Sequence, residues 1–210
     1  MVSLFLTLLA VLAPLVDRPV ADPNAPVVIG LHGRGDTPEN FSHVADGLGP
    51  QFHWVFPRGP LLWKADMQGS QWFDRQTPDG GAAALRTAMA LVEAEVQKAG
   101  KKPVALVGFS QGCMLAAHFV ATHPDQVRAV LCFGGMLLAP VRVPAGKHAV
   151  EVRFIHGRAD PMVPFAKGEE AVATLQKAGL NATLTPHDGG HVIPQVLVPQ
   201  LRAWLTQKLK

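Results

Sequence analysis

The segment Gly108-Phe109-Ser110-Gln111-Gly112 has the residue types and spacing that hold a serine ready for nucleophilic attack. An apolar run at 104–107 precedes it and another at 114–117 follows it, which predicts a strand, a sharp turn and a helix. In that setting the serine hydroxyl is exposed above a parallel sheet, and the glycines avoid collisions with neighbouring backbone. Free N–H groups at the start of the helix would stabilise an anion formed beside the serine.

A serine hydroxyl becomes a useful nucleophile only when a base takes its proton and an acid orients that base. Asp160 follows a strand-like segment, and His191 follows the pair Gly189-Gly190, which lets a loop bring an imidazole over the elbow. The order serine, acid, histidine is the one expected for this kind of elbow. We therefore predict Ser110 as nucleophile, Asp160 as acid and His191 as base.

Other side chains compete for the two partner roles. The alternative bases are His32, His118, His123, His156 and His187. His118 and His123 fall within or at the end of the helix after the elbow. His32 and His156 lie at the ends of strands, where structural hydrogen bonds are expected, and His187 lacks the preceding double glycine. The alternative acid is Asp188, which is too near His191 in sequence to orient it from the far side.

Acyl transfer also needs donors aimed at the developing oxyanion. We predict the backbone N–H groups of Gln111, directly after the nucleophile, and of Arg34, in the glycine-containing loop after the first predicted strand. The pair Gly33-x-Gly35 lacks the third glycine and the downstream acid of a dinucleotide-binding loop, and no metal-ligand cluster or phosphate loop is found in the sequence. We expect no cofactor and no metal.

Strands and helices alternate along the chain. Apolar runs predict strands at 27–31, 52–56, 104–107, 127–133, 150–155 and 182–185, and helical patterns occur at 38–48, 79–99, 114–122, 165–178 and 193–209. This alternation predicts an α/β fold with a mainly parallel sheet covered on both faces. The candidate chemical residues each follow a strand, at the sheet edge where function gathers in such folds.

Residues 58–78 form a long predicted loop rich in aromatic residues, and loops of this length inside a compact domain are usually functional. We expect it to contribute to substrate binding. The candidate pocket residues are Trp72, Phe73 and Met162.

The composition limits the classes of protein that are plausible. A chain of 210 residues suits one domain, which we place at 17–210. The formal net charge is only +3 and the basic residues are scattered, which argues against nucleic-acid binding. Two cysteines, Cys113 and Cys132, are too few for a disulfide framework or a metal site, and we expect both to be small buried residues.

The first 16 residues form an apolar segment that is too short to span a bilayer but has the length of a signal-peptide core. No Lys or Arg precedes the apolar residues, so the alternatives of an exported and a cytoplasmic protein stay open.

Several short blocks together resemble the phospholipase/carboxylesterase family, the small α/β-hydrolases that include the acyl-protein thioesterases. The blocks are LHGRGD at 31–36, PRGP at 57–60, WFD at 72–74, GFSQG at 108–112, HGRADPMVP at 156–164 and GH at 190–191. The resemblance implies an α/β-hydrolase fold without a large lid, the triad and oxyanion donors named above, and action on carboxylic esters. Arg34 stands where the family often has Leu, and Cys113 stands where a small residue is common. A guanidinium at the cleft would favour substrates with a negative group.

The expected function is therefore that of a serine carboxylesterase acting on a small-molecule ester through an acyl-enzyme on Ser110. An acyl-thioesterase or lysophospholipase is the alternative within enzymes, and a catalytically inactive hydrolase-fold binding protein is the alternative of a different class. We expect no nucleic-acid partner and no stable membrane span. A monomer and a homodimer are both compatible with the sequence.

Overall fold

Short apolar strands, most of them buried, form the centre of the molecule in the computed structural model, which describes residues 15–64, 68–138 and 141–210. Within these residues one sheet has the strand order β1-β3-β2-β6-β7-β8-β9. Its strands are β1 (Leu15–Arg18), β2 (Val27–Leu31), β3 (His53–Pro57), β6 (Val104–Phe109), β7 (Ala129–Phe133), β8 (Glu151–Gly157) and β9 (Asn181–His187). Every neighbouring pair is parallel except β1 with β3, which confirms the predicted mainly parallel sheet.

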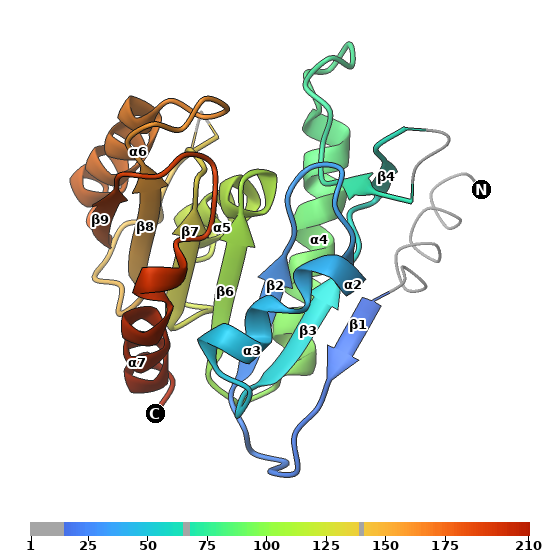
Figure 1. The fold of residues 1–210 in the computed structure, drawn as a ribbon, viewed down its shortest axis with the longest axis vertical. Helices are drawn as coiled ribbons and strands as arrows, with labels where there is room; N and C mark the ends of the chain where they lie inside the picture. Colours follow the sequence, from blue (N-terminus) through green and yellow to red (C-terminus); the bar gives the residue numbers. More distant parts are fainter. Residues whose placement is uncertain (1–14, 65–67, 139–140) are drawn as a thin grey trace.

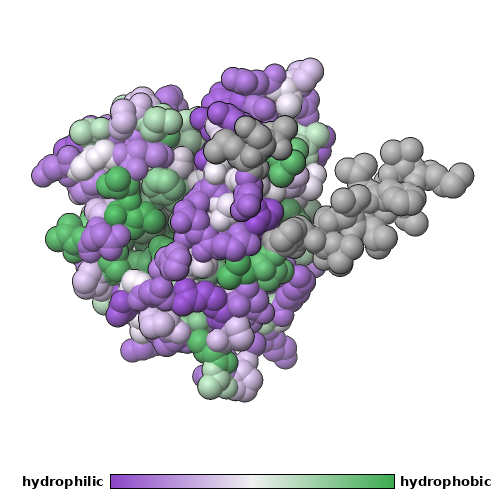
Figure 2. All heavy atoms as spheres, turned by 45° about the vertical axis from the view of Figure 1, so that its right-hand side comes forward, coloured by the Kyte–Doolittle hydropathy of each residue, from purple (hydrophilic) through white to green (hydrophobic). Residues whose placement is uncertain are grey.

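Helices cover both faces of this sheet (Figure 1). Helices α4 (Ala82–Lys98), α5 (Gln111–Thr122) and α6 (Phe165–Lys177) pack on one face. On the other lie α2 (Pro38–Phe41), α3 (Val44–Leu48) and α7 (Val198–Lys208), which follows the short 3-10 helix η1 (Gln195–Leu197). Leu106 of β6 joins the first core, whereas Ala105 and Val107 join the second, as the two-residue period of a strand requires. The outer surface in Figure 2 is mostly hydrophilic, with apolar patches between.

The edge strand β1 was not predicted. Its residues lie across the expected boundary between the apolar segment and the domain that begins at 17, yet Leu15–Arg18 pairs antiparallel with Trp54 to Pro57 of β3. Four residues with alternating half-exposed side chains give no clear strand pattern. Arg18 anchors the strand by donating to the Ser42 carbonyl at 2.7 Å. Residues 1–14 lie outside the described residues, so the domain boundary and the leader segment remain predictions.

Several predicted helices have different bounds, among them α5, which begins at Gln111 and not at 114. The helix predicted at 38–48 is split into α2 and α3 near Ser42, whose Oγ donates to the Glu39 carbonyl at 2.8 Å. Helix α4 begins at Ala82 because Gly81 before it adopts a left-handed φ of 86°. The helix predicted from 193 begins as α7 only at Val198, after η1. Thr37 caps α2 through its side-chain oxygen, which accepts the Asn40 N–H at 3.1 Å.

The long loop at 58–78 contains a small hairpin of β4 (Leu61–Leu62) and β5 (Ser70–Gln71). No helix among the described residues is both long and apolar enough to cross a membrane.

The two cysteines correct one expectation. Both are fully buried, as predicted, but Cys113 and Cys132 form a disulfide, with their Cα atoms 4.7 Å apart. The bond joins the first turn of α5 to β7, directly behind the elbow. Sequence reasoning missed it because pairing depends on two segments that only the folded sheet brings together.

Candidate active site

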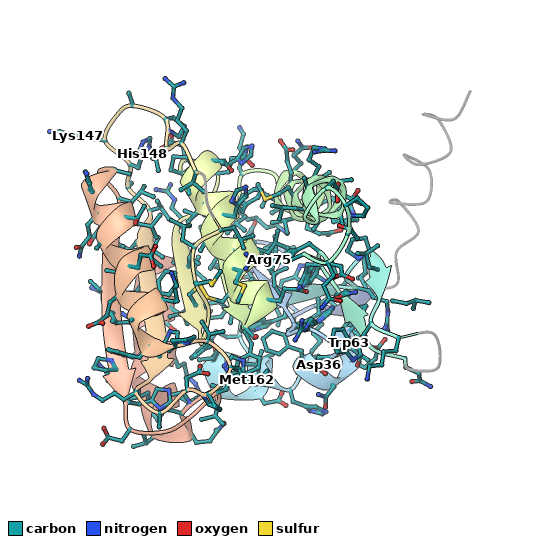
Figure 3. All side chains as sticks on the ribbon, turned by 90° about the horizontal axis from the view of Figure 1, so that it is seen from above. Asp36, Trp63, Arg75, Lys147, His148 and Met162 are labelled. Carbon is teal, nitrogen blue, oxygen red and sulfur yellow. A yellow bond between two sulfur atoms is a disulfide. The ribbon has the colours of Figure 1, made fainter. Side chains whose placement is uncertain are left out.

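The predicted chemical residues gather at the carboxyl ends of the parallel strands. Ser110 follows β6, Asp160 follows β8 and His191 follows β9, while the Gly33-Arg34 loop follows β2. In Figure 1 these ends lie at the top of the sheet, and Figure 3 looks down on them, with Met162 and Asp36 on the same side. The sheet therefore brings together segments that are far apart in the chain.

Ser110 sits on a strained turn. Its φ of 53° is the one positive value for a non-glycine residue in the described parts of the chain. The backbone N–H of Ser110 donates to the Phe133 carbonyl at 2.8 Å, which fixes the turn to β7. A Cβ added at Gly108 would overlap the Gly112 carbonyl, and one at Gly112 would overlap the Leu31 carbonyl. Both glycines are needed because the elbow presses backbone against backbone.

Asp160 and His191 form a close pair. The Asp160 carboxylate is fully buried, and its Oδ2 lies 2.7 Å from His191 Nδ1. Its other oxygen accepts the N–H groups of Met162 and Val163 at 2.8 and 2.9 Å. Burial alone would raise the pKa of Asp160, but these donors and the imidazole outweigh it, so the pKa lies below its usual value. An ionised acid thus holds the imidazole with Nδ1–H toward it, which leaves Nε2 as the basic atom.

The His191 ring is positioned beside the elbow. Its centroid lies 4.8 Å from that of Phe109, the residue before the serine. A Cβ added at Gly134 would lie 3.0 Å from His191 Nδ1 and 3.4 Å from Asp160 Oδ2. Gly134 directly follows Phe133, whose carbonyl holds the serine backbone. The end of β7 therefore contacts both the elbow and the acid–histidine pair.

The loop after β2 also reaches the elbow. A Cβ at Gly33 would lie 3.7 Å from the Cβ of Ser110, so the backbone before Arg34 runs beside the serine. His32 supports this loop from below, with Nδ1 at 2.7 Å from the Gly33 carbonyl and Nε2 accepting the Gly59 N–H at 3.2 Å. Burial lowers the pKa of His32, which keeps the ring neutral and able to accept that bond.

Gln111 has a second task that the sequence did not reveal. We had predicted only its backbone N–H, but its side-chain oxygen accepts the Trp72 N–H at 2.8 Å and its amide donates to the Phe73 carbonyl at 2.7 Å. The Trp72 indole in turn donates to the His32 carbonyl at 2.8 Å. Trp72 has no exposed surface and Phe73 is 4% exposed, whereas Met162 is 63% exposed. Of the three candidate pocket residues, only Met162 presents its side chain to solvent.

Comparison with known proteins places this arrangement in a family. The sequence model of the phospholipase/carboxylesterase family matches residues 16–209. The chain belongs to this family. It is accordingly a serine hydrolase of the carboxylic ester class with an α/β-hydrolase fold, and no large lid is evident in the described residues.

The individual relatives have low sequence identity to this chain. A probable inactive carboxylesterase of Oryza sativa subsp. japonica is 26% identical, covering 89% of this chain and 86% of its own. Acyl-protein thioesterase 1 of Saccharomyces cerevisiae is 28% identical over 71% of this chain and 76% of its own. Among solved structures, esterase PE8 has a TM-score of 0.79 and 26% identity, covering 94% of this chain and 98% of its own.

Of the five alternative histidines, His156 is the one whose ring contacts the acid in the described structure. It is completely buried, with Nε2 at 2.8 Å from the Val163 carbonyl and 3.4 Å from Asp160 Oδ2. It therefore approaches the same carboxylate oxygen as His191, and its position at a strand end before Gly157 was the only sequence signal. His187 instead accepts the Gly189 N–H at 3.1 Å through Nδ1.

His118 lies within α5, and His123 is the residue that caps the C-terminus of this helix. Asp188 is exposed, and the acid that contacts His191 is Asp160. Among the described residues, no group of three or more His, Cys, Asp and Glu side chains is placed to hold a metal ion.

Proposed function

We propose that this protein is a serine carboxylesterase that works through an acyl-enzyme on Ser110, with Asp160 and His191 as the other members of the triad. The observation that carries the proposal is the 2.7 Å contact between the buried Asp160 carboxylate and His191, made beside a serine whose backbone φ is positive. This supports the proposal because a nucleophilic serine needs both an exposed hydroxyl and an oriented base.

In the first half of the reaction, His191 Nε2 takes the proton from the Ser110 hydroxyl as its oxygen attacks the ester carbonyl. The carbonyl oxygen becomes an oxyanion, which accepts hydrogen bonds from the backbone N–H groups of Arg34 and Gln111. Collapse of this intermediate breaks the bond to the alcohol, and the imidazolium gives its proton to the leaving oxygen. The ionised Asp160 stabilises that imidazolium.

In the second half, water replaces the alcohol. His191 takes a proton from the water, whose oxygen attacks the acyl-enzyme, and the same two N–H groups hold the second oxyanion. Its collapse releases the carboxylic acid and returns the proton to Ser110. The triad does not itself select the acyl group, so the acyl-chain preference depends on the side chains around the ester. Met162 is the proposed contributor among the three candidates, because Trp72 and Phe73 are buried.

The test is hydrolysis of para-nitrophenyl esters from acetate to palmitate by the wild type and by Ser110→Ala. We expect kcat to fall by about four orders of magnitude or more in the variant. Two pairs of variants assign the partners: Asp160→Asn against Asp188→Asn, and His191→Gln against His187→Gln. Large losses are expected only for the first member of each pair. Activity that survives in Ser110→Ala would refute the proposal.

Two relatives named above motivate two further measurements. Because one is an acyl-protein thioesterase, turnover of matched oxygen esters and thioesters should be compared. Because another is named inactive, the wild type should be treated with a fluorophosphonate that labels activated serines. We expect Ser110-dependent labelling, and its absence would favour the inactive hydrolase-fold binding protein.

A further inference from the structure

The Arg34 side chain is held in a defined place beside the loop that reaches the elbow. Its guanidinium carbon lies 4.6 Å from the centroid of the Trp63 ring. That indole is itself packed on the loop, because a Cβ at Gly35 would lie only 3.2 Å from its Cδ1 and Nε1. Figure 3 shows Trp63 near Asp36 of the same loop, at the strand-end side of the molecule. Stacking uses the face of the guanidinium and leaves its in-plane N–H donors free.

A second cation shares this ring. Lys64 Nζ lies 5.6 Å from the Trp63 centroid, so two positive groups converge on one indole. An anion bound beside this ring would be attracted by both positive charges. Within the part of the chain that the structure describes, neither Arg34 nor Lys64 has a carboxylate at ion-pair distance.

The acids of the neighbouring segment are engaged elsewhere. Asp36 Oδ1 accepts the Thr37 backbone N–H at 2.9 Å and the Asn40 side-chain amide at 2.7 Å, at the start of α2. Glu39 pairs with Arg58 at 2.7 Å. Among the described residues, these two nearby carboxylates therefore do not neutralise Arg34 or Lys64.

We propose that Arg34, stacked on Trp63 and assisted by Lys64, binds a carboxylate of the substrate, so that the preferred esters carry an anionic group near the scissile bond. This inference rests on the proposed function and names its substrate class. The Arg34 backbone N–H is a proposed oxyanion donor, so its side chain starts beside the reacting carbonyl and reaches a group a few bonds away. A planar guanidinium suits two-point binding of a carboxylate.

The test compares matched anionic and neutral esters. para-Acetoxybenzoate and its methyl ester place the charge on the leaving alcohol, and the mono-para-nitrophenyl ester of adipate and its methyl ester place it on the acyl group. The readout is the ratio of kcat/KM for the anionic to the neutral ester within one protein, which cancels general effects of a substitution. The variants are Arg34→Met and Lys64→Met. Arg128→Met is the control, because it removes the same charge from an exposed residue at the opposite end of the sheet, just before β7.

In one of the two substrate pairs we expect this ratio to fall about tenfold in Arg34→Met and about threefold in Lys64→Met, while Arg128→Met keeps the wild-type value. The responding pair identifies the side of the ester that carries the charge. Equal ratios in all four proteins, with hydrolysis still dependent on Ser110, would overturn the inference and leave the proposed function standing. Hydrolysis that does not depend on Ser110 would instead refute the proposed function.

Discussion

The disulfide between Cys113 and Cys132 allows a quantitative test of the fold around the elbow. The bond closes a loop with a sequence separation of 19 residues. In the chain-entropy treatment, a cross-link of that span raises the free energy of unfolding by about 3 kcal/mol, because it restricts the unfolded chain. For a domain of this size, losing it should lower the Tm by roughly 6 to 12 °C.

The assay is urea denaturation of the oxidised wild type, Cys113→Ala, Cys132→Ala and the double variant. Either single substitution removes the whole bond, so each should lose the cross-link contribution plus the packing of one buried sulfur. The double variant loses the bond only once. The sum of the two single effects should therefore exceed the double effect by about 3 kcal/mol.

Additive single effects would refute this reasoning. They would mean that the two cysteines behave as independent small buried residues, which is what their positions in the sequence had suggested. A second readout separates the cases without any change of side chain: reduction of the unfolded wild type before refolding should lower its urea midpoint to a similar extent.

Two further predictions concern the support of the site. Because burial lowers the pKa of His32, the unfolded chain binds this proton at higher pH, near its ordinary value of about 6.5. Stability should then fall as pH drops from about 7 through the lowered folded-state pKa, and His32→Gln should show a flatter pH dependence of the urea midpoint than the wild type. An unchanged slope in His32→Gln would contradict this account. Gly134→Ala should reduce kcat on para-nitrophenyl acetate by about tenfold or more, because the added Cβ would lie 3.0 Å from His191 Nδ1 and the backbone φ of 57° disfavours a side chain. A near-wild-type kcat in a folded Gly134→Ala variant would contradict this prediction, because it would show that the added methyl group does not disturb His191.

The sequence predicted the sheet well because its inner strands are continuous apolar runs separated by helical patterns. Strands β2 and β6 are buried along almost their whole length, as expected for a parallel sheet that helices cover on both faces. The predicted pairing of Asp160 with His191 is present because the ends of parallel strands meet at one edge of a sheet. These features depend on local pattern and on topology, which a single sequence carries.

Features that depend on the third dimension were missed. The strand β1 has too few residues for a period, and its pairing with β3 becomes visible only when the edge of the sheet is known. The contact of His156 with Asp160 depends on how the chain turns after β8, where the Asp160 N–H donates to the Gly157 carbonyl, and sequence spacing does not define this turn. The burial of Trp72, expected to line a pocket, follows from a hydrogen bond to a loop that lies 40 residues away in the chain.

The hydrogen bonds made by Trp72 explain how the two proposed oxyanion donors can be held in register. One donor, Gln111, belongs to the elbow, and the other belongs to the loop after β2, so no common strand or helix fixes their separation. The Gln111 side chain binds the Trp72 backbone, the Trp72 indole binds the His32 carbonyl, and His32 binds the Gly33 carbonyl next to the second donor. All of these groups are buried, where hydrogen bonds are strong and costly to break. A site built in this way needs little reorganisation when charge develops on the substrate, which is the property that electrostatic stabilisation of an oxyanion requires.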